Sequence, residues 1–144
     1  MRSLLDVNVL IALLDPDHVF HDRAHAWWAA NAKRGWASCP LTENGVVRIM
    51  SNPSYSPNAR FTPADLLARL RQFAAQSNHE FWPDDISLRD QKIFVPQRMH
   101  GSKQLTDIYL LALALKHHGR LATFDQAIPL SAVTDAKPAN LCIA

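Results

Sequence analysis

Short apolar runs, separated by polar and turn-forming residues, recur along the whole chain. Most of these runs are too short for a helix and are bounded by glycine, proline or charged residues, which is typical of buried strands. The expected strands cover residues 1–6, 36–39, 79–82 and 120–124, and a short edge strand is expected at 141–143.

Longer segments carry apolar residues at three-to-four spacing and therefore predict helices that are buried on one side. These helices are expected at residues 8–14, 18–32, 41–50, from Thr62 to about residue 74, and 106–118. Thr42, Thr62 and Thr106 are the expected N-caps, and Gly119 is expected to end the last helix. Between the helices, residues 51–58 form a proline-containing loop, and residues 87–94 form a short helix or an irregular stretch.

Strands that alternate with helices predict a parallel sheet that is covered on both faces. The expected fold class is therefore α/β, with three α/β/α layers and a mainly parallel central sheet of four to five strands. At 144 residues the chain is expected to form a single domain over residues 1–144.

Composition excludes several other classes of protein. The hydrophobic fraction of 48% is ordinary for a globular domain, and no apolar run reaches the roughly 18 residues that suggest a membrane span. Asp6 interrupts the apolar N-terminal segment, which argues against a secretory signal. Cys39 and Cys142 lack the spacing of metal ligands and are interpreted as reduced core residues. We therefore expect a cytoplasmic protein.

Four acidic residues lie at boundaries between predicted apolar elements: Asp6, Glu43, Asp107 and Asp125. The carboxyl ends of parallel strands share one edge of a sheet, so these acids are expected to meet there. Clustered carboxylates repel one another, and a hard divalent cation is the usual remedy. The net charge of +2 leaves the rest of the molecule basic, which suits a polyanionic substrate.

Each acid also has an ordinary structural explanation. Asp6 or Asn8 could serve as the cap of the first helix, and Glu43 and Asp107 would complement the dipoles of their helices. Asp125 could be a turn residue. Each explanation is reasonable for a single residue. Four acids that fall at the same edge of a sheet are better explained by a metal site. Asp107 in particular opens a helix that is apolar nearly all round, where a buried charge needs a partner.

Four short motifs carry a family resemblance: Asp6-x-Asn8, Thr42-Glu43, Thr106-Asp107 and Thr123-Phe124-Asp125. In their order and spacing the chain resembles a PIN domain, and within that family the VapC toxins of bacterial toxin–antitoxin modules. The segment 106–110 and the segment 21–27 favour the toxins over other PIN proteins.

The resemblance implies an endoribonuclease that depends on Mg²⁺ or Mn²⁺ and cuts structured RNA such as tRNA. Asp6, Asp107 and Asp125 would hold the metal, and Glu43 would position the attacking water or complete a second metal site. The resemblance also implies a cognate antitoxin as partner and a homodimer, with the helices between residues 40 and 77 providing the contacts.

Three other residues are assigned smaller roles. Asn8 and Thr106 are not expected to bind the metal themselves. They are expected to orient the carboxylates that do. Arg48, on the same helix as Glu43, either faces the cleft that holds the acids or pairs with Glu43. An exposed ion pair of that kind contributes little to stability.

Two other classes of function remain as alternatives. A receiver-type signalling domain also gathers acids at a sheet edge, but it needs paired acids after the first strand and a lysine after the last. In this chain Asp6 is followed by Asn8, and no lysine follows the fourth strand until Lys137. The other alternative is a non-catalytic PIN scaffold that acts as a regulatory binding module.

Overall fold

The computed structural model describes residues 1–58 and 60–144 and has five parallel strands in one central sheet. The strands are β1 (Ser3–Leu5), β2 (Trp36–Ser38), β3 (His79–Phe81), β4 (Arg120–Thr123) and β5 (Leu141–Ile143). Their order across the sheet is β3-β2-β1-β4-β5, and every neighbouring pair is parallel. The predicted edge strand at 141–143 is confirmed as β5, which pairs with β4.

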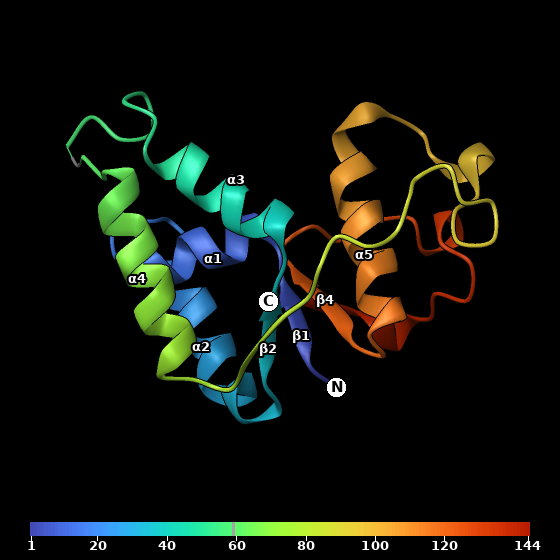
Figure 1. Ribbon diagram of the computed structural model, residues 1–144, viewed down its shortest axis with the longest axis horizontal. Coiled ribbons are helices and arrows are strands. Elements are labelled where there is room, and N and C mark those ends of the chain that lie inside the picture. The colour runs from blue at the N-terminus through green and yellow to red at the C-terminus, as the bar shows by residue number, and fades with distance from the viewer. Residues whose placement is uncertain (59) are drawn as a thin grey trace.

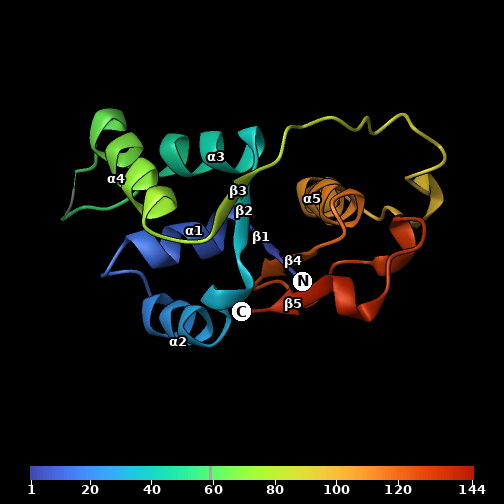
Figure 2. The same cartoon turned by 60° about the horizontal axis from the view of Figure 1, so that its bottom comes forward.

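Helices cover both faces of this sheet, as Figures 1 and 2 show. The helices are α1 (Val7–Leu14), α2 (His21–Asn31), α3 (Pro40–Met50), α4 (Pro63–Ala75) and α5 (Leu105–Lys116). On one face, α5 packs with Leu4, Ala37 and Leu121, and on the other face α1 to α4 pack with Leu5 and Ala122. This alternation along each strand follows from the two-residue period of β-structure. The three-layer α/β/α architecture is therefore confirmed.

Several predicted helix boundaries are wrong, each for a local reason. The helix expected from residue 18 begins at His21, because a carboxylate oxygen of Asp15 accepts a hydrogen bond from the Asp17 amide and holds a turn there. The helix α3 begins at Pro40 instead of after Thr42, and the Thr42 hydroxyl, inside the first turn, accepts a bond from the amide of Cys39, the N-cap. The Thr62 cap is confirmed, since its hydroxyl accepts from the Asp65 amide.

The segments before α5 match expectation only in part. Residues 87–94 form turns and one isolated β-bridge, so the irregular stretch is confirmed and the short helix is not. The helix α5 follows a short 3-10 turn at Ser102–Gln104, so its N-cap is Gln104 and Thr106 lies inside the first turn. Within the described residues, no helix has the length and apolar character that crossing a membrane requires.

Both cysteines are free thiols, as predicted. Cys39 is buried, and its burial raises the pKa of the thiol to about 11, so it stays protonated at neutral pH. Cys142 is half-buried on β5 and accepts a hydrogen bond from the Trp27 indole at 3.3 Å.

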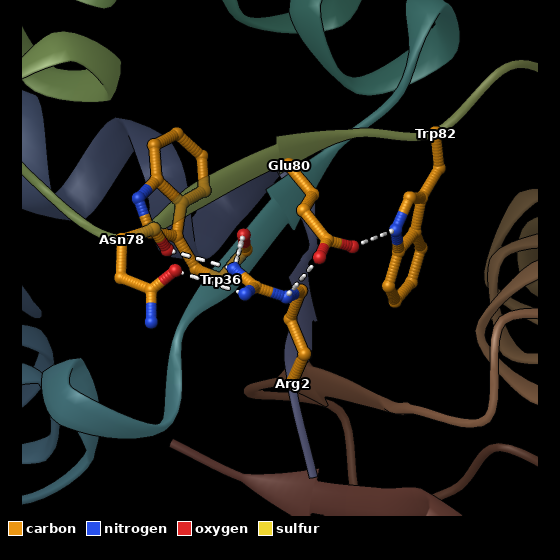
Figure 3. Close-up of polar contacts among 5 residues, drawn as sticks. All are labelled: Arg2, Trp36, Asn78, Glu80 and Trp82. Atoms are coloured by element: carbon orange, nitrogen blue, oxygen red, sulfur yellow. Dashed lines mark hydrogen bonds and ion pairs between the residues drawn. The ribbon is translucent and has the colours of Figure 1, made fainter.

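Arg2 joins three strands at the amino end of the sheet (Figure 3). Its guanidinium donates to the backbone carbonyls of Trp36 (3.0 Å) and Asn78 (2.9 Å) and to the Asn78 side chain (2.9 Å). It also pairs with Glu80 at 3.3 Å, and Glu80 accepts from the Trp82 indole at 3.0 Å. These charge-assisted bonds fix the amino end of the sheet, away from the predicted site.

The chain reverses after α5 at His118 and Gly119, and this turn is sterically demanding. His118, not Gly119, takes the left-handed backbone conformation, with φ of 57°. Gly119 is required for space, because a Cβ atom would lie 2.6 Å from the Arg2 carbonyl oxygen and 2.8 Å from the Trp82 ring. Gly119 also takes part in ending the helix, as predicted, because its amide donates to the Ala114 carbonyl at 2.8 Å.

Gly119→Ala is expected to lower the free energy of unfolding by about 1–3 kcal/mol, because backbone and ring must both shift. Urea denaturation of the purified variant measures this change. Gly101→Ala is the matched control, since a Cβ at Gly101 would meet no atom within 4 Å. Equal stability of the two variants would contradict the close packing at Gly119.

Candidate functional site

Asp6 directly follows β1 at the carboxyl edge of the sheet, next to strand β4. Only 6% of the residue is exposed, and its backbone amide donates to the Ala122 carbonyl. One carboxylate oxygen accepts from the Val7 amide at 2.7 Å and caps α1, while the other accepts from the Thr123 hydroxyl at 2.9 Å. Asp6 can therefore cap α1 and also belong to the acidic cluster, because one oxygen bonds to Val7 and the other contacts Thr123.

Asp125 follows β4, and its local structure is a turn. Its carboxylate accepts from the Ala127 amide at 2.7 Å, and its own amide donates to the Thr123 hydroxyl at 3.1 Å. The single hydroxyl of Thr123 thus links Asp6 to Asp125. Thr123 belongs to the motif identified in the sequence, but its role as the link between the two acids was not predicted.

Asp107 lies in the first turn of α5 and is half-buried. Desolvation raises the pKa of its carboxyl to about 7, and the charges of Asp6 and Asp125 act in the same direction. Burial also raises the pKa of Asp6, with a smaller contribution from Asp125, against the opposing effect of its bonds to Thr123 and Val7. The structure therefore brings these three acids into electrostatic contact, as the sequence predicted.

The donor chemistry of this cluster fits a hard divalent cation. All three side chains offer carboxylate oxygens, the ligands that such cations prefer. The Asp107 carboxyl makes no hydrogen bond or ion pair with another described residue, so its charge is uncompensated within the protein. Among the residues that the structure describes, no three acidic, histidine or cysteine side chains already converge as a complete metal cage. A cation would therefore have to draw the carboxylates together.

Glu43 makes its hydrogen bond with a different polar residue from those that contact Asp6 and Asp125. It is in the first turn of α3, where its carboxylate accepts from the Ser38 hydroxyl at 2.6 Å. The Ser38 hydroxyl also lies 2.8 Å from Nε2 of His79. Burial lowers the pKa of His79, and the charge of Glu43 opposes that effect. Electrostatic coupling is thus seen among three of the four acids. The membership of Glu43 in the same site stays a prediction.

Asn8, Thr106 and Arg48 are all exposed. In the part of the chain that the structure describes, none of their side chains bonds to one of the four acids. The predicted pairing of Arg48 with Glu43 is therefore not formed. The orienting roles assigned to Asn8 and Thr106 remain predictions, and the capping role of Thr106 is wrong because Gln104 is the cap.

Sequence reasoning missed three residues near the site. Ser38 and His79 have no local signal, since the bond from Ser38 to Glu43 and the contact between Ser38 and His79 join two strands and a helix. Asp84 does have a signal, because it is an acid that follows the third strand, with two residues between the end of the strand and Asp84. Its carboxylate accepts from the Leu41 amide at 3.1 Å, at the start of α3.

A hollow of about 610 Å³ lies away from these acids, between the C-terminal half of α5 and residues 85–93. Its rim includes an ion pair between Lys116 and Asp85 at 2.7 Å. None of Asp6, Glu43, Asp107 and Asp125 contributes to its lining, so the size of this hollow does not identify it as the site of chemistry.

The fold and the carboxylate cluster together define a PIN domain, and the chain belongs to the PIN domain family, whose model matches residues 3–133. Within this family its relatives are VapC ribonucleases of Mycobacterium tuberculosis. Ribonuclease VapC44 is 52% identical over 142 residues, which is 98% of each chain. Ribonuclease VapC39 is 43% identical over 92% of this chain and 94% of its own. Ribonuclease VapC29 is 38% identical over 89% of each. These matches place the chain in the VapC group.

Proposed function

We propose that this protein is a metal-dependent endoribonuclease that serves as the toxin of a bacterial toxin–antitoxin pair. The observation that carries the proposal is that the Thr123 hydroxyl joins Asp6 and Asp125 at the carboxyl edge of the sheet. The charges of these two acids also raise the pKa of Asp107, in the first turn of α5. The names of the relatives, all ribonucleases, support the choice of RNA as substrate. Phosphodiester and carboxylates are all anionic, so they can meet only when a cation lies between them.

Mg²⁺ or Mn²⁺ is the proposed cofactor, held by Asp6, Asp107 and Asp125. Such a cation, when bound, offsets the charge of the phosphate and makes a neighbouring water more nucleophilic. The Thr123 hydroxyl orients Asp6 for this purpose, and the first turn of α5 presents Asp107. Glu43 is the fourth acid of the proposed catalytic set, and its carboxylate directs the attacking water.

The proposed reaction is in-line attack of water on phosphorus. A bond forms between the water oxygen and phosphorus while the bond from phosphorus to the 3′ oxygen breaks. The products are therefore a 3′-hydroxyl and a 5′-phosphate. Structured RNA such as tRNA is the proposed substrate. We propose that Arg48, which is exposed on the same helix as Glu43, contacts the RNA backbone.

Cleavage of total tRNA and rRNA tests this function directly. Wild-type protein is expected to give discrete fragments with Mg²⁺ or Mn²⁺ and none with excess EDTA. Asp125→Asn serves as the purification control, because an asparagine oxygen can still accept from the Ala127 amide and preserve the turn. Equal cleavage by both proteins would point to a contaminating nuclease and remove the support for the proposal.

The proposed partners are a cognate antitoxin and a second copy of the chain. Apolar side chains remain exposed on the helices predicted to make these contacts, with Leu67 on α4 at 49% and Leu41 on α3 at 38%. An arginine from the antitoxin would pair well with the carboxylate cluster and compete with the cation. We propose that the pair acts in the cytoplasm, where its RNA substrates are found.

A non-catalytic binding module remains the second hypothesis for the same fold. It predicts that no RNA is cut under any metal condition, although a divalent cation still raises the melting temperature by binding the native state. The cleavage experiment, run together with a melting curve, therefore separates the two hypotheses.

A further inference from the structure

A polar chain connects the β3 edge of the sheet with helix α3. It runs from His79 on β3, through Ser38 at the end of β2, to Glu43 in the first turn of α3. The hydroxyl oxygen of Ser38 lies 2.8 Å from His79 Nε2 and 2.6 Å from Glu43 Oε2. Three elements that are separate in the sequence thus share one hydrogen-bonded unit.

The direction of these hydrogen bonds follows from the number of protons available. A serine hydroxyl has one proton, and an ionised carboxylate can only accept. Ser38 therefore donates to Glu43, and its lone pair accepts from His79, which must carry a proton on Nε2. The chain is ordered from His79 to Ser38 to Glu43, and it ends on the carboxylate.

The surroundings hold both donors in place. Ser38 is almost completely buried, with 1% exposed, so its hydroxyl has no competing solvent. The His79 ring lies against the Trp36 ring, with 4.4 Å between centroids. Trp36 is itself fixed by a bond of 2.8 Å from its indole to the Ser77 hydroxyl. Glu43, at the end of this supported chain, lines an open hollow of about 200 Å³.

We propose that Ser38 and His79 are positioning residues that fix the direction of the Glu43 carboxylate for catalysis. This inference rests on the proposed ribonuclease function. An unsupported glutamate has several rotatable bonds, and holding it in one arrangement removes an entropy cost from the reaction. Ser38 acts on Glu43 directly by donating its hydroxyl proton. His79 acts through Ser38, because a ring nitrogen that donates to the hydroxyl cannot accept its proton, which is then left for Glu43.

A positioning role predicts a particular kinetic effect. Substitution of an outer residue that orients a catalytic group typically costs about 10-fold to 100-fold in activity. Ser38→Ala is expected to lower kcat for cleavage of total tRNA by that factor and to leave KM unchanged, because RNA binding does not require Glu43 to be fixed. Ser38→Thr retains the hydroxyl and is expected to restore most of the activity. His79→Leu is expected to cause a smaller loss.

Ser3→Ala provides a matched control. Ser3 is also 1% exposed and lies on the adjacent strand β1, but its hydroxyl accepts from Arg120 at 2.9 Å. Loss of this hydroxyl perturbs a buried strand to a similar degree without touching any of the four acids. We therefore expect kcat of Ser3→Ala to match that of the wild type.

The decisive measurement is a double-mutant cycle with Glu43→Gln. If Ser38 acts only through Glu43, Ser38→Ala lowers kcat in the wild-type background and causes no further loss in the Glu43→Gln background. An equal loss in both backgrounds would mean that Ser38 has a purely structural role, and the inference would be overturned.

Two further outcomes separate this inference from the proposed function. If wild-type protein cuts RNA but Glu43→Gln cuts equally well, the inference fails and the ribonuclease function stands. If wild-type protein cuts no RNA with either metal, both fail. The ¹⁵N signals of His79 give an independent check, because the inference requires the Nε2-protonated tautomer, which a Nδ1-protonated ring would contradict.

Discussion

Asp6→Asn is expected to reduce RNA cleavage by about 10³-fold, because a bound cation contributes several kcal/mol to the transition state and every 1.4 kcal/mol is tenfold in rate. The fold should survive the change. The asparagine oxygen can still accept from the Val7 amide and cap α1, and the amide nitrogen replaces only the oxygen that contacts Thr123. Removal of a buried carboxyl whose pKa is raised by burial also removes a desolvation cost.

Fragment yield over time, with Mg²⁺ and with Mn²⁺, measures the effect. Asp17→Asn is the matched control, since Asp17 is exposed in the turn after α1 and the same charge is removed. Cleavage by Asp17→Asn should equal that of the wild type. If Asp6→Asn retained activity within tenfold of the wild type while folding normally, the cation would not be held at the carboxylate cluster.

The layered architecture and the coupling of three of the acids could be predicted from the sequence, because both follow from the order of strands and helices along the chain. Alternating short apolar runs and amphipathic segments leave few arrangements other than a covered parallel sheet. In such a sheet the ends of β1 and β4 are adjacent, so Asp6 and Asp125 must lie close to each other. The all-apolar helix α5 had to be central, which brought Asp107 to the same place.

The placement of Glu43 could not be predicted, because it depends on contacts between distant elements. Its position at the start of α3 is consistent with the rule for sheet edges, but its bond from the Ser38 hydroxyl, which in turn contacts His79, has no signal in the sequence. Helix boundaries failed for a related reason. Thr42 and Thr106 are both good capping residues, but Pro40 and the 3-10 turn before α5 start those helices earlier.

Asp107→Asn is expected to abolish cleavage and, at the same time, to stabilise the metal-free protein. The pKa of Asp107 is raised to about 7, mainly by desolvation and further by Asp6 and Asp125, whereas in the unfolded chain it is near 3.8. The native state therefore binds this proton more tightly than the unfolded state does. Its stabilising contribution is complete below pH 4 and is lost as the pH rises through 7.

Asparagine has no charge at any pH, so the advantage of the variant should grow between pH 4 and pH 8. The full shift would correspond to about 4 kcal/mol, and solvent screening at a half-buried carboxyl reduces the expected gain to about 2 kcal/mol at pH 8. Urea denaturation in EDTA across this pH range measures the difference. A constant difference across the range would contradict a raised pKa at Asp107.

Added Mg²⁺ provides the second half of this prediction. A cation that binds only the native state stabilises the wild type in proportion to the logarithm of its concentration. The wild type should therefore approach the stability of Asp107→Asn as Mg²⁺ is added at pH 8, while the variant responds less because one carboxylate is missing. Asp65→Asn, in the exposed first turn of α4, should show the wild-type response. The half-buried negative charge of Asp107, which desolvation and the neighbouring acids make unfavourable in the metal-free protein, is then the same property that favours binding of a cation.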